Sequence, residues 1–330
     1  MQRILILRFS SLGDVVLLGA LVDELRTRWP KHEIWLATKP DYAPLFEDDT
    51  RLNRVLRLSH ESGGLRGLAR ELQSVEFDLV LDAHGSLRSR LLCLALAGTP
   101  VKRIAKDTAA RLLFLRTRVA TPPLTRHQVD RYLALAGAEG KSVRPTLQLR
   151  EKDHASATAI LGGSELPFLA VAPGSRHATK QWPLERFSEV AAHWQREGHG
   201  EVVILGSEQE RELCQEMASL LPREARVCAG ELDLRALAAL LSRCRVLLCN
   251  DSGLMHLSEA AGTPVLAVFG PTSRELGYFP LDPRSRVVEN ELPCRPCSRN
   301  GARPCHMEQE YCLLLSDSDR VIRILEENWT

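Results

Sequence analysis

The chain has 330 residues, of which 44% are hydrophobic and 26% charged, and this suits a globular protein of about two domains. Its 43 basic and 42 acidic residues leave a net charge of +1, so no global field draws it to nucleic acid or an anionic membrane. No apolar run approaches the ~18 residues that a membrane-spanning helix needs.

The first half alternates short apolar runs with amphipathic stretches. We predict strands at 3–9, 32–38, 77–82 and 101–104, and helices at 14–29, 66–74, 86–97 and 129–136. Arg8, Ser10 and Ser11 interrupt the first apolar run, so we interpret it as a buried strand and not as a signal peptide. We therefore expect a cytoplasmic protein whose cysteines are reduced.

The same alternation then starts again. A predicted helix at 151–161 closes a first domain of residues 1–160. In a second domain, 161–330, we predict strands at 168–172, 201–205, 227–229, 246–250 and 265–269, with helices at 184–197, 208–221, 233–242, 253–261 and the C-terminus. This order predicts an α/β fold of two Rossmann-like, doubly wound parallel sheets facing across a cleft, with ligands at the carboxyl ends of the strands.

The first strand runs directly into Ser10-Ser11-Leu12-Gly13-Asp14. Gly13 permits a tight turn, and a carboxylate in the first turn of a helix is favoured by the helix dipole. Asp14 is therefore either a helix cap or a base that takes a proton from an acceptor hydroxyl.

Two further loops have the composition of an anion site. Pro173-Gly174-Ser175, followed by Thr179 and Lys180, offers a glycine turn, hydroxyls and an ammonium for a diphosphate, although Lys180 is alternatively a solvated loop lysine. Asn250-Asp251-Ser252-Gly253-Leu254-Met255-His256 joins an apolar strand to a helix whose free N–H groups favour an anion, with His256 one turn on or, alternatively, in the core. Neither loop is a P-loop and no G-x-G-x-x-G follows a strand, which disfavours ATP hydrolysis and NAD chemistry.

Cysteines and basic residues form two clusters that lie outside these motifs. Cys294, Cys297, Cys305 and Cys312 have a spacing that suits a Cys₄ zinc or iron site, distant from the donor motifs, or else they are free thiols. Eight basic residues between Arg88 and Arg118 form either an anionic acceptor site or a solvated helix face.

Three motifs in this order, SSLGDVV, PGSRHATKQWPLERF and NDSGLMHLSEAAGTPVLAVFGPT, resemble glycosyltransferase family 9 over nearly the whole chain. The resemblance implies a GT-B enzyme that transfers heptose, with inversion, from ADP-L-glycero-β-D-manno-heptose to the inner core of lipopolysaccharide. It implies that Asp14 is the catalytic base and that Lys180 contacts the donor diphosphate. Its remaining implied donor contacts are Asp251, Ser252, Gly253 and His256 for the nucleotide sugar, Glu208 for the ribose and Leu232 for the adenine.

The resemblance also bears on cofactors and partners. It implies that catalysis requires no metal and that the acceptor is an anionic saccharide-lipid. The protein would then make at most peripheral contact with the inner face of the inner membrane, and nucleic acid is not an expected partner. Similar cysteine clusters occur in family members resembling heptosyltransferase II, which favours a structural role. The alternatives are a non-catalytic nucleotide-sugar-binding subunit and a GT-B enzyme that uses a different nucleotide sugar.

Overall fold

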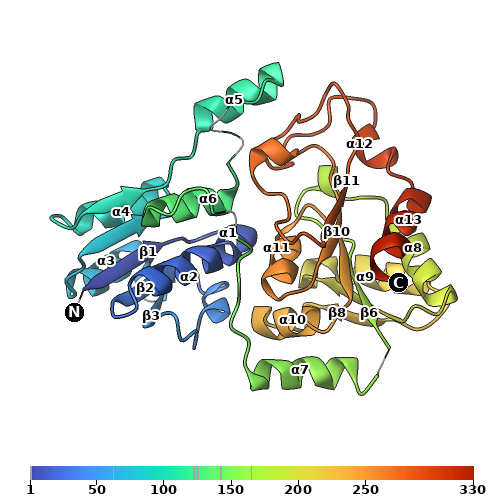
Figure 1. The fold of residues 1–330 in the computed structure, drawn as a ribbon, viewed down its shortest axis with the longest axis horizontal. Helices are drawn as coiled ribbons and strands as arrows, with labels where there is room; N and C mark the ends of the chain where they lie inside the picture. Colours follow the sequence, from blue (N-terminus) through green and yellow to red (C-terminus); the bar gives the residue numbers. More distant parts are fainter. Residues whose placement is uncertain (1, 62, 122–123, 125, 142, 165) are drawn as a thin grey trace. The chain divides into compact units, whose positions relative to one another are not determined.

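A computed structural model describes residues 2–61, 63–121, 124, 126–141, 143–164 and 166–330. The chain forms two compact units, one of residues 1–107 and 126–148, the other of residues 108–125 and 149–330. Each unit is an all-parallel sheet with helices on both faces, as the sequence predicts (Figure 1).

The first unit contains a five-stranded sheet in the order β3-β2-β1-β4-β5. Helices α3 and α4 cover one face through a shared apolar core, while α2 and α6 pack together. The elements are β1 Arg3–Leu7, α1 Leu12–Val16, α2 Leu18–Arg28, β2 Glu33–Thr38, β3 Arg54–Arg57, α3 Gly64–Gln73, β4 Leu79–Asp82, α4 Leu87–Ala95, β5 Val101–Arg103 and α6 Gln128–Leu133.

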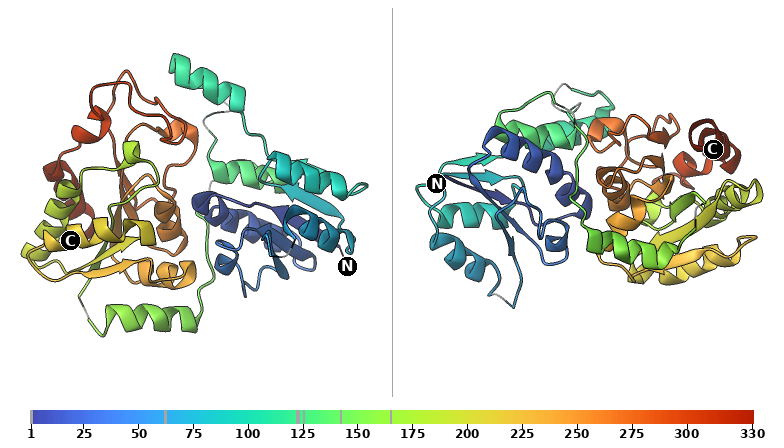
Figure 2. Two further views of the ribbon diagram at one scale, coloured as in Figure 1. Left: turned by 180° about the vertical axis from the view of Figure 1, so that it is seen from behind. Right: turned by 60° about the horizontal axis from the view of Figure 1, so that its bottom comes forward.

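The second unit contains a six-stranded sheet in the order β11-β10-β9-β6-β7-β8. Its elements are α5 Thr108–Thr117, α7 Glu151–Leu161, β6 Phe168–Ala172, the 3-10 helix η3 Ala178–Lys180, α8 Leu184–Arg196, β7 Glu201–Gly206, η4 Glu208–Glu210, α9 Arg211–Ser219, β8 Arg226–Ala229, α10 Leu234–Leu241, β9 Val246–Asn250, α11 Gly253–Ala260, β10 Val265–Val268, β11 Arg286–Val288, α12 Tyr311–Leu314 and α13 Ser318–Trp329. The C-terminal helix α13 lies along α8, as the views in Figure 2 show.

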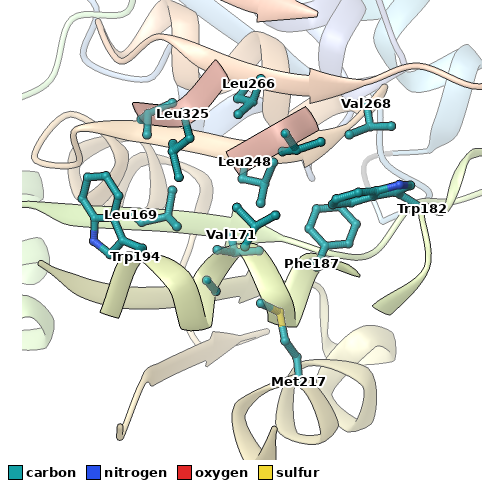
Figure 3. Close-up of a cluster of buried hydrophobic side chains, with 14 of the residues drawn as sticks. Leu169, Val171, Trp182, Phe187, Trp194, Met217, Leu248, Leu266, Val268 and Leu325 are labelled. Carbon is teal, nitrogen blue, oxygen red and sulfur yellow. The ribbon is translucent and has the colours of Figure 1, made fainter. Parts of the chain in front are cut away.

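The core of the second unit lies between its sheet and helices α8, α9 and α13. Side chains from β6, β9 and β10 meet Trp182, Phe187 and Trp194 there (Figure 3). Each of these large apolar groups contributes about 1.5–3 kcal/mol when it is fully buried. The rings of Trp182 and Phe187 meet edge to face, 4.9 Å apart. This packing fixes the strands, and so it fixes the loops that leave their carboxyl ends.

The unit boundary differs from the predicted domain boundary at residue 160. Helix α7 packs against α10 of the second unit, where Asp153 and Arg235 form an ion pair of 2.7 Å with both side chains 6% exposed. Such a buried pair fixes α7 because each charge is costly to leave without its partner. The second unit therefore begins before α7, at Leu149, and also includes residues 108–125.

Strand order reverses beside β1 in the first sheet and beside β6 in the second. In the first sheet β1 lies between β2 and β4, and in the second β6 lies between β7 and β9. In open α/β sheets, ligands bind at this point, outside the carboxyl ends of the strands. The loops that follow β1, β4, β6 and β9 are thus the candidate binding loops.

Candidate functional site

In the first unit, Asp14 lies at the reversal point, in the first turn of α1. Its Oδ2 accepts hydrogen bonds from the Ser11 backbone N–H at 3.3 Å and the Ser11 hydroxyl at 3.1 Å. It also forms an ion pair of 2.5 Å with Arg8, and the two side chains are about one-tenth exposed. The carboxylate therefore does cap the helix, and it also pairs with the guanidinium of Arg8.

Arg8 and Tyr132 hold this group from two other directions. Arg8 donates a hydrogen bond of 2.8 Å to the carbonyl of Ala83, directly after β4. The Tyr132 hydroxyl, on α6, donates to the backbone carbonyl of Asp14 at 3.2 Å. The loops after β1 and β4 are thereby joined around the Asp14 carboxylate.

The loop after β4 adds His84 to the same site. Asp82, fully buried at the end of β4, accepts hydrogen bonds from the backbone N–H groups of His84 and Gly85 and from Arg103. Burial, together with the charges of Arg8 and Lys106, lowers the pKa of His84 from 6.5 to about 4. The imidazole is therefore neutral at pH 7.

In the second unit, the loops after β6 and β9 meet at buried Asn250. Its side-chain amide donates to the carbonyls of Pro173 and Gly174, and its Oδ1 accepts the backbone N–H of Trp182. Ser175 is itself buried, and its carbonyl accepts a hydrogen bond of 2.8 Å from Gln181. The two anion-binding loops predicted from the sequence, which begin at Pro173 and Asn250, thus form one structure. They are called the donor loops below.

Lys180 and Asp251 come together at the centre of these loops. The Lys180 Nζ lies 2.5 Å from Asp251 Oδ2, and both side chains are about nine-tenths buried. The Thr272 hydroxyl donates to the same Oδ2 at 2.7 Å. Lys180 is therefore not a solvated loop lysine.

Helix α11 begins directly after this ion pair. Ser252 is its N-cap residue, in an extended conformation, and Gly253 is its first residue. The Ser252 Oγ is buried and has no hydrogen-bond partner among the described residues. His256, one turn further on, is 3% exposed, and its ring lies 6.1 Å from that of Tyr278. An ammonium, free helix N–H groups and an unsatisfied hydroxyl together provide what a phosphate binds.

Glu208 follows the end of β7, the strand next to β6, and Leu232 follows the end of β8, the edge strand beyond β7. Glu208 pairs with Arg211 at 2.8 Å and is largely exposed. The hydrogen bond and charge of Arg211 lower the Glu208 pKa. Gly230 packs against Glu208, since a Cβ at Gly230 would lie 2.3 Å from the carboxylate. The half-buried Leu232 is thereby brought near Glu208, at the edge of the loops.

The Cys-rich segment, residues 294–312, contacts the donor loops, so the prediction that it lies distant from them is wrong. The Thr179 hydroxyl donates a hydrogen bond of 2.6 Å to the Gly301 carbonyl, and the Cys297 N–H donates to the Pro271 carbonyl at 3.1 Å. Burial raises the pKa of Cys312 to about 11, with smaller effects from the charges of Arg295 and of the thiols of Cys297, Cys294 and Cys305. Among the described residues, no three of these four thiols lie within 4.8 Å of one another, so the structure does not bring them together as a preformed metal site, and metal binding by them stays a prediction.

Comparison with known proteins extends these observations. The profile of Glycosyltransferase family 9 (heptosyltransferase) matches residues 65–307. The chain belongs to this family. It is therefore a glycosyltransferase, and the resemblance of its three motifs to family 9 is confirmed.

Two curated relatives and one solved structure match this glycosyltransferase over most of its length. Lipopolysaccharide heptosyltransferase 2 of Escherichia coli K12 is 28% identical, covering 87% of this chain and 88% of its own. Lipopolysaccharide heptosyltransferase 1 of Pseudomonas aeruginosa PAO1 is 29% identical, with 90% and 86% covered. The structure of E. coli ADP-heptose lps heptosyltransferase II has a TM-score of 0.77 at 26% identity, with 99% and 98% covered. The predicted GT-B fold is confirmed by this likeness.

The basic cluster between Arg88 and Arg118 is divided between the two units of the glycosyltransferase. Arg103 pairs with buried Asp82 in the first unit. Arg111 and Arg118 belong to the second unit, where they donate to the carbonyls of Leu276 and Cys294. Five other members are exposed: Arg88 and Arg90 of α4, Lys102, Lys106 and Arg116.

One group of three side chains could hold a metal ion among the described residues. It consists of His193, His199 and Glu326, whose ligand atoms all lie within 4.8 Å of one another. His193 Nε2 lies 2.8 Å from Glu326. The group lies at the end of α8, next to the start of β7. This is the edge of the sheet opposite the donor loops, so a metal bound there could not reach the diphosphate.

Proposed function

We propose that this glycosyltransferase transfers heptose, with inversion, from ADP-L-glycero-β-D-manno-heptose to the inner core of lipopolysaccharide. The relatives named above are heptosyltransferases acting on lipopolysaccharide, and one structure is named for ADP-heptose. The observation that carries the proposal is the pairing of Lys180 with Asp251 at the start of α11, beside the unsatisfied Ser252 hydroxyl.

The donor diphosphate would contact the Lys180 ammonium, which Asp251 holds in place. The Thr272 hydroxyl also donates a hydrogen bond to the Asp251 carboxylate, so the carboxylate has a second polar partner. Ser252 Oγ and the N–H groups at Gly253 would donate to the same phosphates, with Ser175, Thr179 and His256 around them. These groups stabilise the negative charge that develops on the leaving ADP, which accounts for transfer without a catalytic metal.

The nucleoside end of the donor would lie over the neighbouring strand ends. The Glu208 carboxylate can accept hydrogen bonds from a ribose hydroxyl pair, in competition with its partner Arg211. Leu232, two residues beyond Gly230, would contact the adenine. The apolar contact gives little discrimination between bases, so adenine preference is a necessary test of the proposal.

Asp14 would remove the proton from the acceptor hydroxyl as that oxygen attacks the anomeric carbon. Arg8 and Ser11 hold the carboxylate in one orientation, as a general base requires. The neutral His84 can accept or donate a hydrogen bond to the acceptor sugar without adding a positive charge.

Helix α4 has the surface that an anionic saccharide-lipid acceptor would contact. Leu87, Leu91 and Leu94 are 74%, 46% and 72% exposed and recur at helical spacing. Arg88 and Arg90 are exposed between them. Among the described residues no helix is both long and apolar enough to cross a membrane. We propose peripheral contact with the inner face of the inner membrane, through apolar and basic side chains together.

For the Cys-rich segment, we propose that Cys294, Cys297, Cys305 and Cys312 hold one zinc or iron ion in a structural role. Four sulfur ligands have the chemistry that such an ion prefers, and binding would draw the thiols together, since no three of them lie within 4.8 Å of one another among the described residues. The ion would fix the segment's fold, and no step of the transfer reaction passes through it.

Calorimetric titration of the purified protein with ADP, UDP and GDP tests the donor site. The proposal predicts that ADP binds and that UDP and GDP bind at least about tenfold more weakly, since each tenfold is ~1.4 kcal/mol. Preference for UDP would identify a GT-B enzyme that uses a different nucleotide sugar. Binding of ADP without any transfer would indicate the non-catalytic subunit.

A further inference from the structure

The side chain of Lys180 lies across a turn of the Cys-rich segment. A Cβ placed on Gly301 would lie 2.9 Å from Cγ and 3.0 Å from Cδ and Cε of Lys180. Three of the four methylene groups of the lysine side chain therefore occupy the space that a side chain at residue 301 would need. Gly301 also has a φ of +85°, so its position requires glycine for two independent reasons.

This turn, residues 298–301, is itself held by a buried hydroxyl. Ser298 is 1% exposed, and its Oγ accepts the Gly301 N–H at 2.9 Å. On its other side, the Gly301 carbonyl accepts the hydroxyl of Thr179, the residue before Lys180. The Gly301 turn is thus fixed both to its own segment and to the loop that carries the lysine.

Arg295, in the same segment, fixes the other half of the ion pair. Its side chain is 6% exposed and donates to the carbonyls of Gly270 at 2.6 Å and Thr272 at 2.7 Å. Thr272 in turn donates its hydroxyl to Asp251 Oδ2, the oxygen that Lys180 contacts. Both members of the ion pair are therefore oriented by the Cys-rich segment.

We propose that residues 295–301 are a positioning element of the donor site, which holds the Lys180 ammonium where a nucleoside diphosphate binds. This inference rests on the proposed function, because it assigns the segment a task at the same site. A free lysine loses much rotamer freedom when it is fixed on a ligand, and a preformed platform removes that loss from the binding step. Arg295, Ser298 and Gly301 act through Lys180 and Asp251 and do not contact the donor.

The test is the affinity of the full-length protein for ADP, measured by calorimetry for Gly301→Ala and for a matched control. Gly301→Ala places a methyl group against the lysine chain, and we expect it to weaken ADP binding about three- to tenfold, the range for loss of preorganisation of one long side chain. Gly198→Ala is the control, since Gly198 lies in the same unit with a φ of +75° and has nothing within 4 Å of its Cβ position. It carries the same backbone strain and should leave ADP affinity unchanged.

The same substitution in a Lys180→Ala background isolates the route of the effect. Without the methylene chain, Gly301→Ala can no longer displace the lysine, so ADP affinity should fall no further than in Lys180→Ala alone. An equal loss with and without the lysine would overturn the proposal, and so would a Gly301→Ala affinity equal to that of Gly198→Ala. Should Gly301→Ala fail to fold, Ser298→Ala provides the second variant, with the same expected loss and the same dependence on Lys180.

The proposed function fails in a different way. If the parent protein binds ADP and Lys180→Ala binds it equally well, the donor diphosphate does not contact Lys180. That result refutes the donor site itself, and the positioning role with it. Weaker binding in Lys180→Ala together with unchanged binding in Gly301→Ala refutes the positioning role alone.

Discussion

The imidazole of His84 gives the site beside Asp14 a measurable signature. Burial, then the charges of Arg8 and Lys106, lower its pKa from 6.5 to about 4. Between these two values the unfolded chain binds a proton at His84 that the native protein does not bind. The contribution of His84 to the free energy of unfolding should therefore be complete above pH 6.5. The free energy of unfolding should fall as the pH is lowered from 6.5 towards 4.

The size of the effect follows from the shift. A difference of about 2.5 pKa units corresponds to ~3.4 kcal/mol at 1.36 kcal/mol per unit. His84 is only half-buried, so solvent screening reduces the expected contribution to about 1–2 kcal/mol. Glutamine does not titrate. As the pH is lowered through this range, the free energy of unfolding of His84→Gln should therefore fall by about 1–2 kcal/mol less than that of the parent.

Two assays check this prediction. Proton NMR titration should show a histidine signal with a midpoint near pH 4 that is missing in His84→Gln. Urea unfolding at pH 7 and pH 4.5 should show the smaller pH dependence in the variant, whereas His154→Gln, on the exposed face of α7, controls for removal of a histidine. A His84 midpoint at or above 6.5, or equal pH dependence in parent and His84→Gln, would refute the electrostatic description of the site.

Three other predictions concern the remaining sites. Asp14→Asn should lower turnover by ~10²–10⁴-fold with ADP affinity near that of the parent; a variant that keeps most of its turnover would leave Asp14 as a helix cap. Lys180→Met and Asp251→Ala should each weaken ADP binding, Lys180→Met by about 10- to 100-fold at low salt, the range for loss of a charge-assisted hydrogen bond. The Lys180 effect should shrink as salt rises, and unchanged calorimetric affinity in both variants would remove the donor from these loops. Protein purified without chelators should contain about one zinc or iron per chain, and Cys297→Ser should lose it and become more sensitive to protease in the Cys-rich segment. Four freely titratable thiols and no metal by elemental analysis would contradict that prediction.

The same Cys297→Ser variant has a further consequence that the sequence alone did not predict. The segment contacts Thr179 and Lys180, so a disordered segment should also weaken ADP binding. A donor site distant from the segment, as the sequence predicted, would have been unaffected by this substitution. Segments separated by more than 100 residues meet here through single hydrogen bonds and a glycine contact, which leave no periodic signal in the sequence.

Most of the sheet architecture was predictable because buried parallel strands are short, nearly continuous apolar runs between turn residues. The strands Phe168–Ala172 and Val246–Asn250 were predicted to the residue. Several elements were missed, three of them for identifiable reasons. β3 (RVLR) and β11 (RVV) are edge strands with only two adjacent apolar residues each, too short a run to indicate a strand. Helix α5 leaves Leu112 and Leu113 exposed, so its apolar residues do not form one stripe.

The donor loops were predictable from strand ends, whereas the surroundings of Asp14 were only partly so. Arg8 was counted as the end of a strand, and its pairing with Asp14 depends on how the chain turns at Ser10 and Ser11. Tyr132 reaches Asp14 from a helix 118 positions away. His84 follows a strand in the same way as the predicted residues, so the rule that ligands gather at strand ends would have found it.

The central claim is tested most directly by the transfer reaction itself. Purified protein would be incubated with ADP-L-glycero-β-D-manno-heptose and isolated lipopolysaccharide inner-core acceptor, and both ADP release and the anomeric configuration of the product would be followed by NMR. The account predicts stoichiometric release of ADP and an α-linked heptose, because the β-linked donor is inverted, with both lost in Asp14→Asn. Release of ADP without acceptor glycosylation, a β-linked product, or transfer only from a uridine-linked sugar would contradict it.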